Sequence, residues 1–268
     1  MAAVASLGRH VSRQTYHHRA AACRAFASTS SNRAPAPEGI NVQAAKRALA
    51  SAQAVCFDVD STVCTEEGID VLAGFCGAAE AVAEMTKKAM GGNMLFQDAI
   101  RMRLELMRPS TAIVERCLRE HPPQLSPGMA DLAAALHERG TDVYLVSGGF
   151  RSMIYPVAKV LGIPESRVYA NTIMYNADGS YQGFDEQEPT SRDGGKPAVV
   201  KALKAQHGYA PVVMVGDGVT DMQARPPAEA FIGYGGVAVR DAVRRGADWY
   251  VYDFQDMIEV VRGGAPRQ

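Results

Sequence analysis

The sequence of 268 residues predicts an α/β fold: a doubly wound parallel sheet with a helical cap inserted after the first strand and a small β-hairpin flap. Three observations predict it. Continuous apolar runs, typical of strands buried on both faces, alternate with helical segments. A mainly helical block of about sixty residues follows the first run without a convincing strand. One later segment has the alternation and the turn residues of a hairpin.

The first half of the chain contains the first strand and the helical block. We expect a short helix at 40–53 and the first strand at 54–59, where Cys56 belongs to the core. Residues 78–108 are helical in character, with one break at a Gly-Gly-Asn sequence. Ser110 can cap a further helix, and the sequence HPPQLSPG then requires a loop.

The second half alternates strands with helices. Further strands are expected in the runs DVYLVSGG, RVYAN, PVVMVGDG, AFIGY and DWYVYD. Helices are expected near 152–161 and 196–206. The segment TIMYNADGSYQGF predicts the hairpin, which turns at Asp178-Gly179. This alternation is the pattern of parallel strands joined by helical crossovers.

These elements predict the domain organisation. The core comprises residues 38–66 and 126–262, the cap comprises residues 67–125, and residues 263–268 form a loose tail. Residues 1–37 contain no acidic residue and five arginines among Ala, Ser and Thr, which is typical of an organellar transit peptide. A plain disordered tail is the alternative. We expect import into the plastid (chloroplast) stroma, with the mitochondrial matrix as the alternative address.

Composition limits the partners. The net charge of -1 gives no reason to expect nucleic acid or an anionic membrane surface. No apolar stretch approaches the roughly 20 residues that a membrane-spanning helix needs. The five cysteines form neither a CxxC pair nor a zinc-like cluster, which argues for reduced thiols rather than a disulfide framework. We therefore expect a soluble protein with no nucleic-acid and no membrane partner.

Three of the predicted strands end in polar, glycine-containing sequence. These ends are Asp58-Val59-Asp60, Ser147-Gly148-Gly149 and Gly216-Asp217-Gly218. Each could be only a tight turn, but ligands bind where the carboxyl ends of parallel strands meet, so we expect all three at one crevice. Lys196, at a predicted helix start, and Asp221 complete the set of charged candidates.

The four aspartates of this set would bring several negative charges together. Such a cluster needs a bound cation, and a site with only oxygen ligands favours Mg²⁺. An EF-hand loop beginning at Asp58 is excluded, because Val63 and Ile69 stand where glycine and glutamate are required. A Walker A loop that would end at Gly195-Lys196 is excluded too, because Thr190 stands where its first glycine is required and Pro197 stands where a hydroxyl residue is required.

The order of four motifs, DVDST, VSGG, GGK and GDGVTD, resembles that of haloacid-dehalogenase-superfamily phosphohydrolases. Within that superfamily, the segments FDVDSTVCTEEGID, EMTKKAMGG, SGGFRS and GDGVTDMQARPPA closely resemble eukaryotic phosphoserine phosphatases of the plant or algal type. The resemblance covers residues 54–254. It implies a Rossmann-like core and Mg²⁺-dependent hydrolysis of O-phospho-L-serine to L-serine and phosphate, the last step of the phosphorylated serine biosynthesis pathway.

The resemblance also implies the catalytic roles. Asp58 would be the nucleophile that forms an aspartyl-phosphate, and Asp60 would protonate the leaving oxygen and then accept a proton from water. Lys196 and Ser147 would contact the phosphoryl oxygens. In such phosphatases Mg²⁺ binds the side chains of Asp58 and Asp217 and the backbone carbonyl of Asp60.

Substrate choice is expected to depend on the cap. The resemblance implies that Glu67 binds the ammonium and Arg103 the carboxylate of the substrate, although by themselves these residues fit a solvated surface. Asp221 would hold Lys196 or a metal-bound water, with a helix N-terminal cap as the alternative. The other substrate-binding residues that the resemblance implies are Met90, Gly91, Phe96, Ser147, Gly148, Gly149, Lys196 and Thr220.

The sequence leaves two other functions open. A phosphotransferase would hand the same phosphoryl group to another small hydroxyl acceptor. A non-catalytic binder of phosphorylated ligands would be expected to lack one of the catalytic residues, all of which are present here. The oligomeric state is open as well, with a homodimer as one option.

Overall fold

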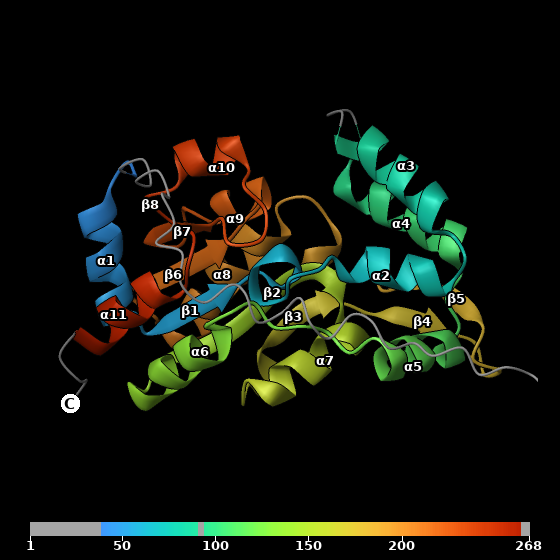
Figure 1. Cartoon of the computed structure of the whole chain (residues 1–268), viewed down its shortest axis with the longest axis horizontal. Coiled ribbons are helices and arrows are strands. Elements are labelled where there is room, and N and C mark those ends of the chain that lie inside the picture. Colours follow the sequence, from blue (N-terminus) through green and yellow to red (C-terminus); the bar gives the residue numbers. More distant parts are fainter. Residues whose placement is uncertain (1–38, 91–93, 264–268) are drawn as a thin grey trace, which may run out of the picture. The chain divides into compact units, whose positions relative to one another are not determined.

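A six-stranded parallel sheet with the strand order β3-β2-β1-β6-β7-β8 forms the centre of the computed structural model (Figure 1). Residues 39–90 and 94–263 are described. The strands are β1 (Ala54–Phe57), β2 (Asp142–Phe150), β3 (Val168–Asn171), β6 (Val212–Gly216), β7 (Ala230–Tyr234) and β8 (Trp249–Val251). From β1 the chain adds β2 and β3 toward one edge of the sheet, and then β6, β7 and β8 toward the other edge. The predicted doubly wound sheet is therefore confirmed, with its topological switch point between β1 and β6.

Helices cover both faces of this sheet. One face is covered by α1 (Val42–Ser51), α6 (Met129–Glu138), α7 (Arg151–Val160) and α11 (Gln255–Gly263). The other is covered by α8 (Gly195–His207), α9 (Val219–Met222) and α10 (Asp241–Gly246). Because successive side chains of a strand alternate, Val55 and Phe57 pack on the first face, and Ala54 and Cys56 pack on the second.

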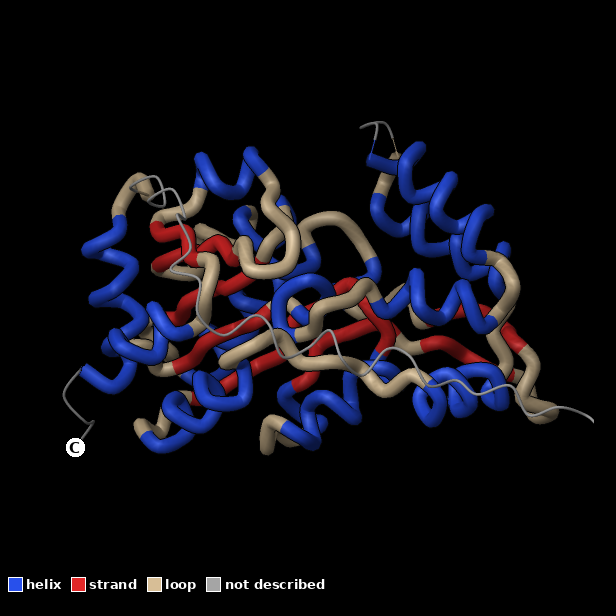
Figure 2. Tube along the Cα trace, viewed as in Figure 1, coloured by secondary structure: helices blue, strands red, loops and turns tan. Residues whose placement is uncertain are grey.

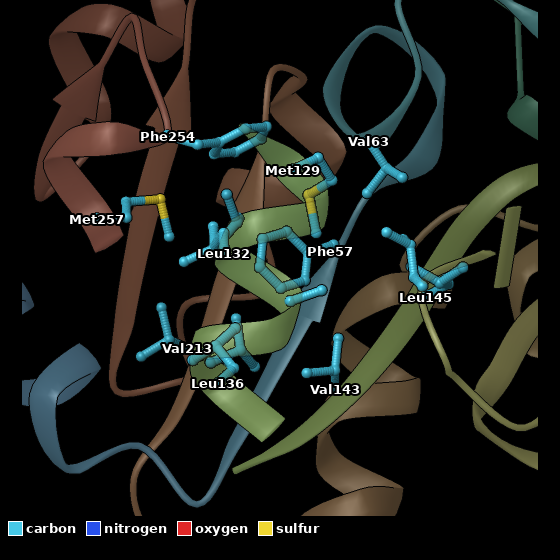
Figure 3. Packing of buried hydrophobic residues seen from close by; sticks show 14 of the residues in the cluster. Phe57, Val63, Met129, Leu132, Leu136, Val143, Leu145, Val213, Phe254 and Met257 are labelled. Carbon is cyan, nitrogen blue, oxygen red and sulfur yellow. The ribbon is translucent and has the colours of Figure 1, made fainter. Parts of the chain in front are cut away.

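The larger core cluster holds the end of β1 in place (Figure 3). Phe57 is fully buried among side chains from α6 and α11, including Leu132 and Leu136. The Phe254 ring meets Phe57 edge-on, with ring centroids 6.5 Å apart. Burial of such a side chain stabilises the fold by about 1.5–3 kcal/mol. The residue that follows, Asp58, therefore leaves the strand from a well-packed position.

The cap is formed by α2 (Gly68–Phe75), α3 (Ala79–Met90), α4 (Phe96–Met107) and α5 (Thr111–Glu120). The predicted hairpin is confirmed: β4 (Ile173–Tyr175) and β5 (Tyr181–Phe184) pair antiparallel. Figure 2 shows the cap helices and the hairpin at the same end of the sheet. Leu72, Leu104 and Phe184 belong to one buried cluster between them. The boundaries of the core and cap domains stay a prediction.

Some local features differ from the sequence prediction. β1 ends at Phe57 rather than at 59, because the chain turns at Val59–Val63, here η1. The Cys64 N–H closes this turn by donating to the Val59 carbonyl at 2.8 Å, and Asp60 and Ser61 within it have non-helical dihedral angles. The helices α2 and α6 have no counterpart among the predicted elements. Ser110 does cap α5 as predicted, by accepting the Ile113 N–H at 3.3 Å. Two short 3₁₀ turns, η2 (Glu165–Arg167) and η3 (Pro189–Ser191), complete the described elements.

The termini lie largely outside the described residues. This applies to the predicted transit peptide at 1–37 and to 264–268 of the predicted tail, whereas Gly263 ends α11. No helix in the described part of the chain is long and apolar enough to cross a membrane. The described cysteines are free thiols, and Cys56 is fully buried, which raises its pKa to about 12. The prediction that Cys56 belongs to the core is confirmed.

Candidate active site

The carboxyl ends of β1, β2 and β6 open into a cleft of about 200 Å³, here called the main cleft. Side chains of α4 line its cap side. The predicted residues on its wall are Asp58, Asp60, Glu67, Phe96, Arg103, Gly148, Gly149, Lys196, Asp217 and Thr220. These residues are far apart in the sequence, and the parallel sheet brings them together at its switch point.

A tight local fold holds Asp58 at the end of β1. Its N–H donates to the Val215 carbonyl at 2.9 Å, which extends the pairing with β6 by one residue. Its carboxylate Oδ1 accepts the Val59 N–H at 2.7 Å. Ser61 turns the chain with a φ of 54°, a left-handed conformation that costs free energy in a residue other than glycine. The Ser61 hydroxyl is held there by donating to Glu67 Oε1 at 2.7 Å.

Lys196 is buried between two carboxylates. Its Nζ lies 2.8 Å from Asp58 Oδ2 and 2.6 Å from Asp221 Oδ1. Burial by itself would lower the pKa of Lys196, but the Asp221 and Asp58 carboxylates outweigh burial and raise that pKa. The side chain therefore remains an ammonium. Pro197 follows in the first turn of α8, where a helix needs no backbone donor.

Asp221 contacts Lys196, as one of the two alternatives has it, but it is the third residue of α9 and Gly218 occupies the N-cap position. Its Oδ1 binds Lys196, while its Oδ2 accepts the Gly218 N–H at 3.0 Å at the start of α9. The carboxylate is fully buried. A Cβ atom on Gly216 would lie 2.2 Å from the Asp221 carboxyl carbon, so only glycine leaves room for this arrangement.

Asp217 is paired on both of its oxygens. Oδ1 accepts the Thr62 hydroxyl at 3.2 Å, and Oδ2 accepts Arg240 Nε at 2.7 Å. Burial and Asp58 raise the pKa of Asp217, and Arg240 opposes them. Arg240 was not among the predicted residues. Its sequence signal is weak, because it is a single cation after the run GGVAV that follows β7.

Asp60 reaches the main cleft from within η1. Its Oδ1 accepts the Gly68 N–H at 2.7 Å. Burial, Glu67 and Asp58 raise the pKa of Asp60 to about 7, so the carboxyl group can carry a proton near neutral pH. Gly149 packs directly against it, since a Cβ atom there would lie 2.9 Å from Asp60 Oδ2.

Ser147 lies behind the wall of the main cleft. The residue is fully buried, and its Oγ accepts the Gly149 N–H at 2.9 Å. The Gly148 carbonyl accepts Asn171 Nδ2 at 2.8 Å, and Asn171 Oδ1 accepts the Thr190 hydroxyl at 2.9 Å. These hydrogen bonds fix the backbone of the Ser-Gly-Gly turn. Asn171 and Thr190 were not predicted, because neither belongs to a recognisable motif.

Three cap residues reach the main cleft. The Phe96 ring stands over Gly148, where a Cβ atom would lie 2.6 Å from a ring carbon. Arg103 Nε donates to the Ala99 carbonyl at 3.0 Å, and burial lowers the pKa of Arg103 although nearby carboxylates oppose it. Burial raises the pKa of Glu67. The Met90 side chain and Gly91, which were also predicted to bind substrate, lie outside the described residues.

The buried charges fit a divalent cation. Asp58, Asp217 and Asp221 are all buried and bring carboxylate oxygens within 4.8 Å of one another. Burial and Asp58 raise the pKa values of both Asp217 and Asp221, as expected where negative charge is in excess. All three carboxylates have partners on both oxygens, but Asp58 and Asp217 line the main cleft and Asp221 does not. Asp58 and Asp217 are therefore the side chains best placed to bind an ion that prefers oxygen ligands.

Residues 55–224 match the profile of the haloacid dehalogenase-like hydrolases. The chain belongs to this family. The phosphoserine phosphatase of Bos taurus is 52% identical to this hydrolase over 208 residues, which cover 78% of this chain and 92% of that protein. The chloroplastic phosphoserine phosphatase of Arabidopsis thaliana is 51% identical over 210 residues, which cover 78% of this chain and 71% of that protein. The plastid address of this hydrolase stays a prediction.

Solved structures share the fold of this hydrolase. A phospho-aspartyl intermediate analogue of phosphoserine phosphatase superposes with a TM-score of 0.68 at 25% identity, over 78% of this chain and 98% of that chain. DsGPDH of Dunaliella salina superposes with a TM-score of 0.71 at 34% identity over 80% of this chain, but the match spans 37% of that longer protein. The Rossmann-like fold implied by the sequence resemblance is confirmed.

Replacing Gly149 with alanine should lower the turnover of this hydrolase by about tenfold or more. The added methyl group would lie 2.9 Å from Asp60 Oδ2 and 3.1 Å from Ser147 Oγ, so it would displace the Asp60 carboxylate. Gly74→Ala in α2 is the matched control, because nothing lies within 4 Å of its added Cβ. Initial rates and thermal unfolding should be measured for both variants; equal rates would contradict this packing.

Proposed function

We propose that this hydrolase is a phosphoserine phosphatase, which converts O-phospho-L-serine and water to L-serine and phosphate. One observation carries the proposal: the main cleft holds Asp58 and Lys196 on its sheet side and Glu67 and Arg103 on its cap side. The first pair suits a phosphoryl group, and the second suits the ammonium and carboxylate of an amino acid. The bovine and Arabidopsis relatives, which are phosphoserine phosphatases, support it.

In the first step Asp58 acts as the nucleophile. Its carboxylate oxygen bonds to phosphorus while the bond from phosphorus to the serine oxygen breaks. The electron pair of the broken bond stays on the serine oxygen, which takes the proton that Asp60 carries. Lys196, whose Nζ lies 2.8 Å from Asp58, offsets the negative charge of the phosphoryl oxygens, so that the two anions can approach.

In the second step water releases the phosphate. The water oxygen bonds to phosphorus, and the bond from phosphorus to the Asp58 oxygen breaks, with its electron pair returning to the carboxylate. Asp60 accepts a proton from the water, which restores the protonated form that the next substrate needs. The same side chain thus serves both half-reactions, which its position at the cleft wall allows.

Mg²⁺ is the cofactor in this proposal. The side chains of Asp58 and Asp217 and the backbone carbonyl of Asp60 would hold it. The bound ion would supply positive charge to the phosphoryl oxygens. Arg240, now 2.7 Å from Asp217 Oδ2, would share that carboxylate with the ion. The support for this assignment is the buried set of oxygen donors, which hard cations prefer.

Asp58→Asn should abolish phosphoserine hydrolysis, lowering kcat by about 10³-fold or more, because an amide is not a nucleophile. After acid quenching, the wild-type protein incubated with ³²P-labelled phosphoserine should carry covalent label and the variant should carry none. Asp131→Asn, on the exposed face of α6, is the matched control and should keep the wild-type rate. Hydrolysis that persists in Asp58→Asn would contradict the covalent mechanism.

Arg103→Ala should lower kcat/KM for phosphoserine by about 100-fold, because a charge-assisted contact to the carboxylate is lost. Phosphoethanolamine lacks that carboxylate and should be affected far less. Arg101→Ala on the same helix is the control, since Arg101 pairs with Asp98 and Glu186 at the surface. Equal losses on the two substrates would remove Arg103 from substrate recognition.

Exhaustive chelation should remove phosphoserine turnover, and added Mg²⁺ should restore it. Asp217→Asn should raise the Mg²⁺ concentration for half-maximal activity by about tenfold or more, because an amide is a weaker ligand than a carboxylate. Titration calorimetry with Mg²⁺ should show the same weakening of binding. Turnover that is unchanged after chelation would exclude the ion from the mechanism.

A further inference from the structure

A chain of buried hydrogen bonds joins the Ser-Gly-Gly turn to η3. Asn171, the last residue of β3, is fully buried, and Thr190 in η3 is 3% exposed. Asn171 Nδ2 donates to the Gly148 carbonyl at 2.8 Å, and Asn171 Oδ1 accepts the Thr190 hydroxyl at 2.9 Å. A carbonyl can only accept hydrogen bonds, so the amide nitrogen has to face Gly148 and the amide oxygen has to face Thr190. These two partners hold the Asn171 side chain in one orientation.

The chain acts on the peptide group between Gly148 and Gly149. Asn171 holds the carbonyl of this peptide group, and Ser147 Oγ accepts its N–H at 2.9 Å. Both glycines line the main cleft, where they can offer a ligand only their backbone groups. Asn171 does not line the main cleft, so the Gly148 carbonyl is directed to a buried side chain outside it. The peptide group is therefore held at both ends.

The other end of the chain reaches the segment that carries Lys196. Thr190 lines the main cleft. The helix α8 begins in direct contact with η3, since a Cβ atom on Gly195 would lie 2.2 Å from the Pro189 carbonyl oxygen and 2.9 Å from Thr190 Cα. The hydrogen-bond chain thus connects two segments on the phosphoryl side of the main cleft, the Ser-Gly-Gly turn and the start of α8.

We propose that Asn171 and Thr190 are positioning residues for the phosphoryl part of the substrate, an inference that rests on the proposed function. Their hydrogen bonds keep the Gly148 carbonyl turned away from the phosphoryl oxygens. Glycine restrains the rotation of a peptide group less than any other residue, so without these bonds the carbonyl can turn into the main cleft. A carbonyl oxygen carries partial negative charge and repels an anionic phosphoryl group.

The effect is confined to the phosphoryl part of the substrate. Glu67 and Arg103, the proposed partners of the amino-acid part, lie on the cap side of the main cleft. Rotation of a peptide group in the Ser-Gly-Gly turn leaves these two side chains in place. Two inhibitors probe the two parts separately: orthovanadate, an oxyanion with the shape of phosphate, and L-serine, which has the ammonium and the carboxylate but no phosphoryl group.

Two variants each break one link of the chain. Thr190→Val removes the hydroxyl and keeps the branched shape of the side chain. Asn171→Asp keeps the shape and the acceptor for Thr190, but it places a carboxylate where the Gly148 carbonyl needs a donor. Thr190→Ser retains the hydroxyl and should behave as the wild type.

Thr172→Val is the matched control. It removes a hydroxyl from the residue next to Asn171, where the hydroxyl donates to Glu188 Oε1 at 3.0 Å. Glu188 keeps its ion pair with Arg151 at 2.8 Å, so the carboxylate is not left without a partner. Inhibition constants for both inhibitors are measured against phosphoserine hydrolysis with Mg²⁺ present, together with kcat. An inhibition constant does not depend on the folded fraction, so partial unfolding of a variant does not alter it.

In Thr190→Val and Asn171→Asp we expect the inhibition constant of orthovanadate to rise by about tenfold or more, and kcat to fall by a similar factor. The inhibition constant of L-serine should stay within about twofold of the wild-type value. Thr190→Ser and Thr172→Val should match the wild type in all three quantities. An unchanged orthovanadate constant, an equal rise for both inhibitors, or the same loss in Thr172→Val would overturn the inference.

Failure of the proposed function would look different. The wild-type protein would then not hydrolyse phosphoserine at all. Orthovanadate binding to the wild type, Thr190→Val and Asn171→Asp can still be compared by titration calorimetry. Weaker binding to the two variants would support the role of Asn171 and Thr190, and equal binding to all three proteins would overturn it.

Discussion

The buried contact of Lys196 with Asp58 and Asp221 is the interaction on which the rest of the site depends. It joins the end of β1, the start of α8 and the helix that follows β6. Removing one partner from such a buried pair costs about 3–5 kcal/mol, because the remaining charge is left without compensation. The three segments therefore have to meet, and they can do so because β1 and β6 are neighbours at the centre of the sheet.

Two features of the site follow from this contact. Lys196 compensates only part of the buried negative charge, so Asp217 takes Arg240 as a partner and the site still favours a divalent cation. The carboxylates also need space close to the backbone. Gly149 leaves that space for Asp60, and Gly216 leaves it for Asp221. The buried carboxylates at the switch point between β1 and β6 therefore require glycine at these two backbone positions.

In the proposed mechanism, Asp58 and Lys196 do not decide which acceptor receives the phosphoryl group. A hydrolase and a phosphotransferase use the same groups to form the aspartyl-phosphate, and they differ in which acceptor reaches it. Here Asp60 borders both a wide cleft, lined by the cap residues Glu67 and Arg103, and a narrow crevice beside the segments that join core and cap. In the proposed function the cap residues recognise the donor substrate, so the choice of acceptor depends on the space beside Asp60.

The sequence alone determined the parallel sheet, the hairpin, the strand-end residues Asp58 and Asp217 and the helix-start residue Lys196, because apolar runs and the motifs beside them are local patterns. Helix α2 was not predicted as a separate element, because a helix of only 8 residues shows little of the helical periodicity on which such a prediction rests. Only the tertiary structure decided that Arg240 pairs with Asp217, that Ser147 lies behind the cleft wall, and that a second crevice borders Asp60. Each of these depends on the packing of segments distant in sequence, which no local pattern records.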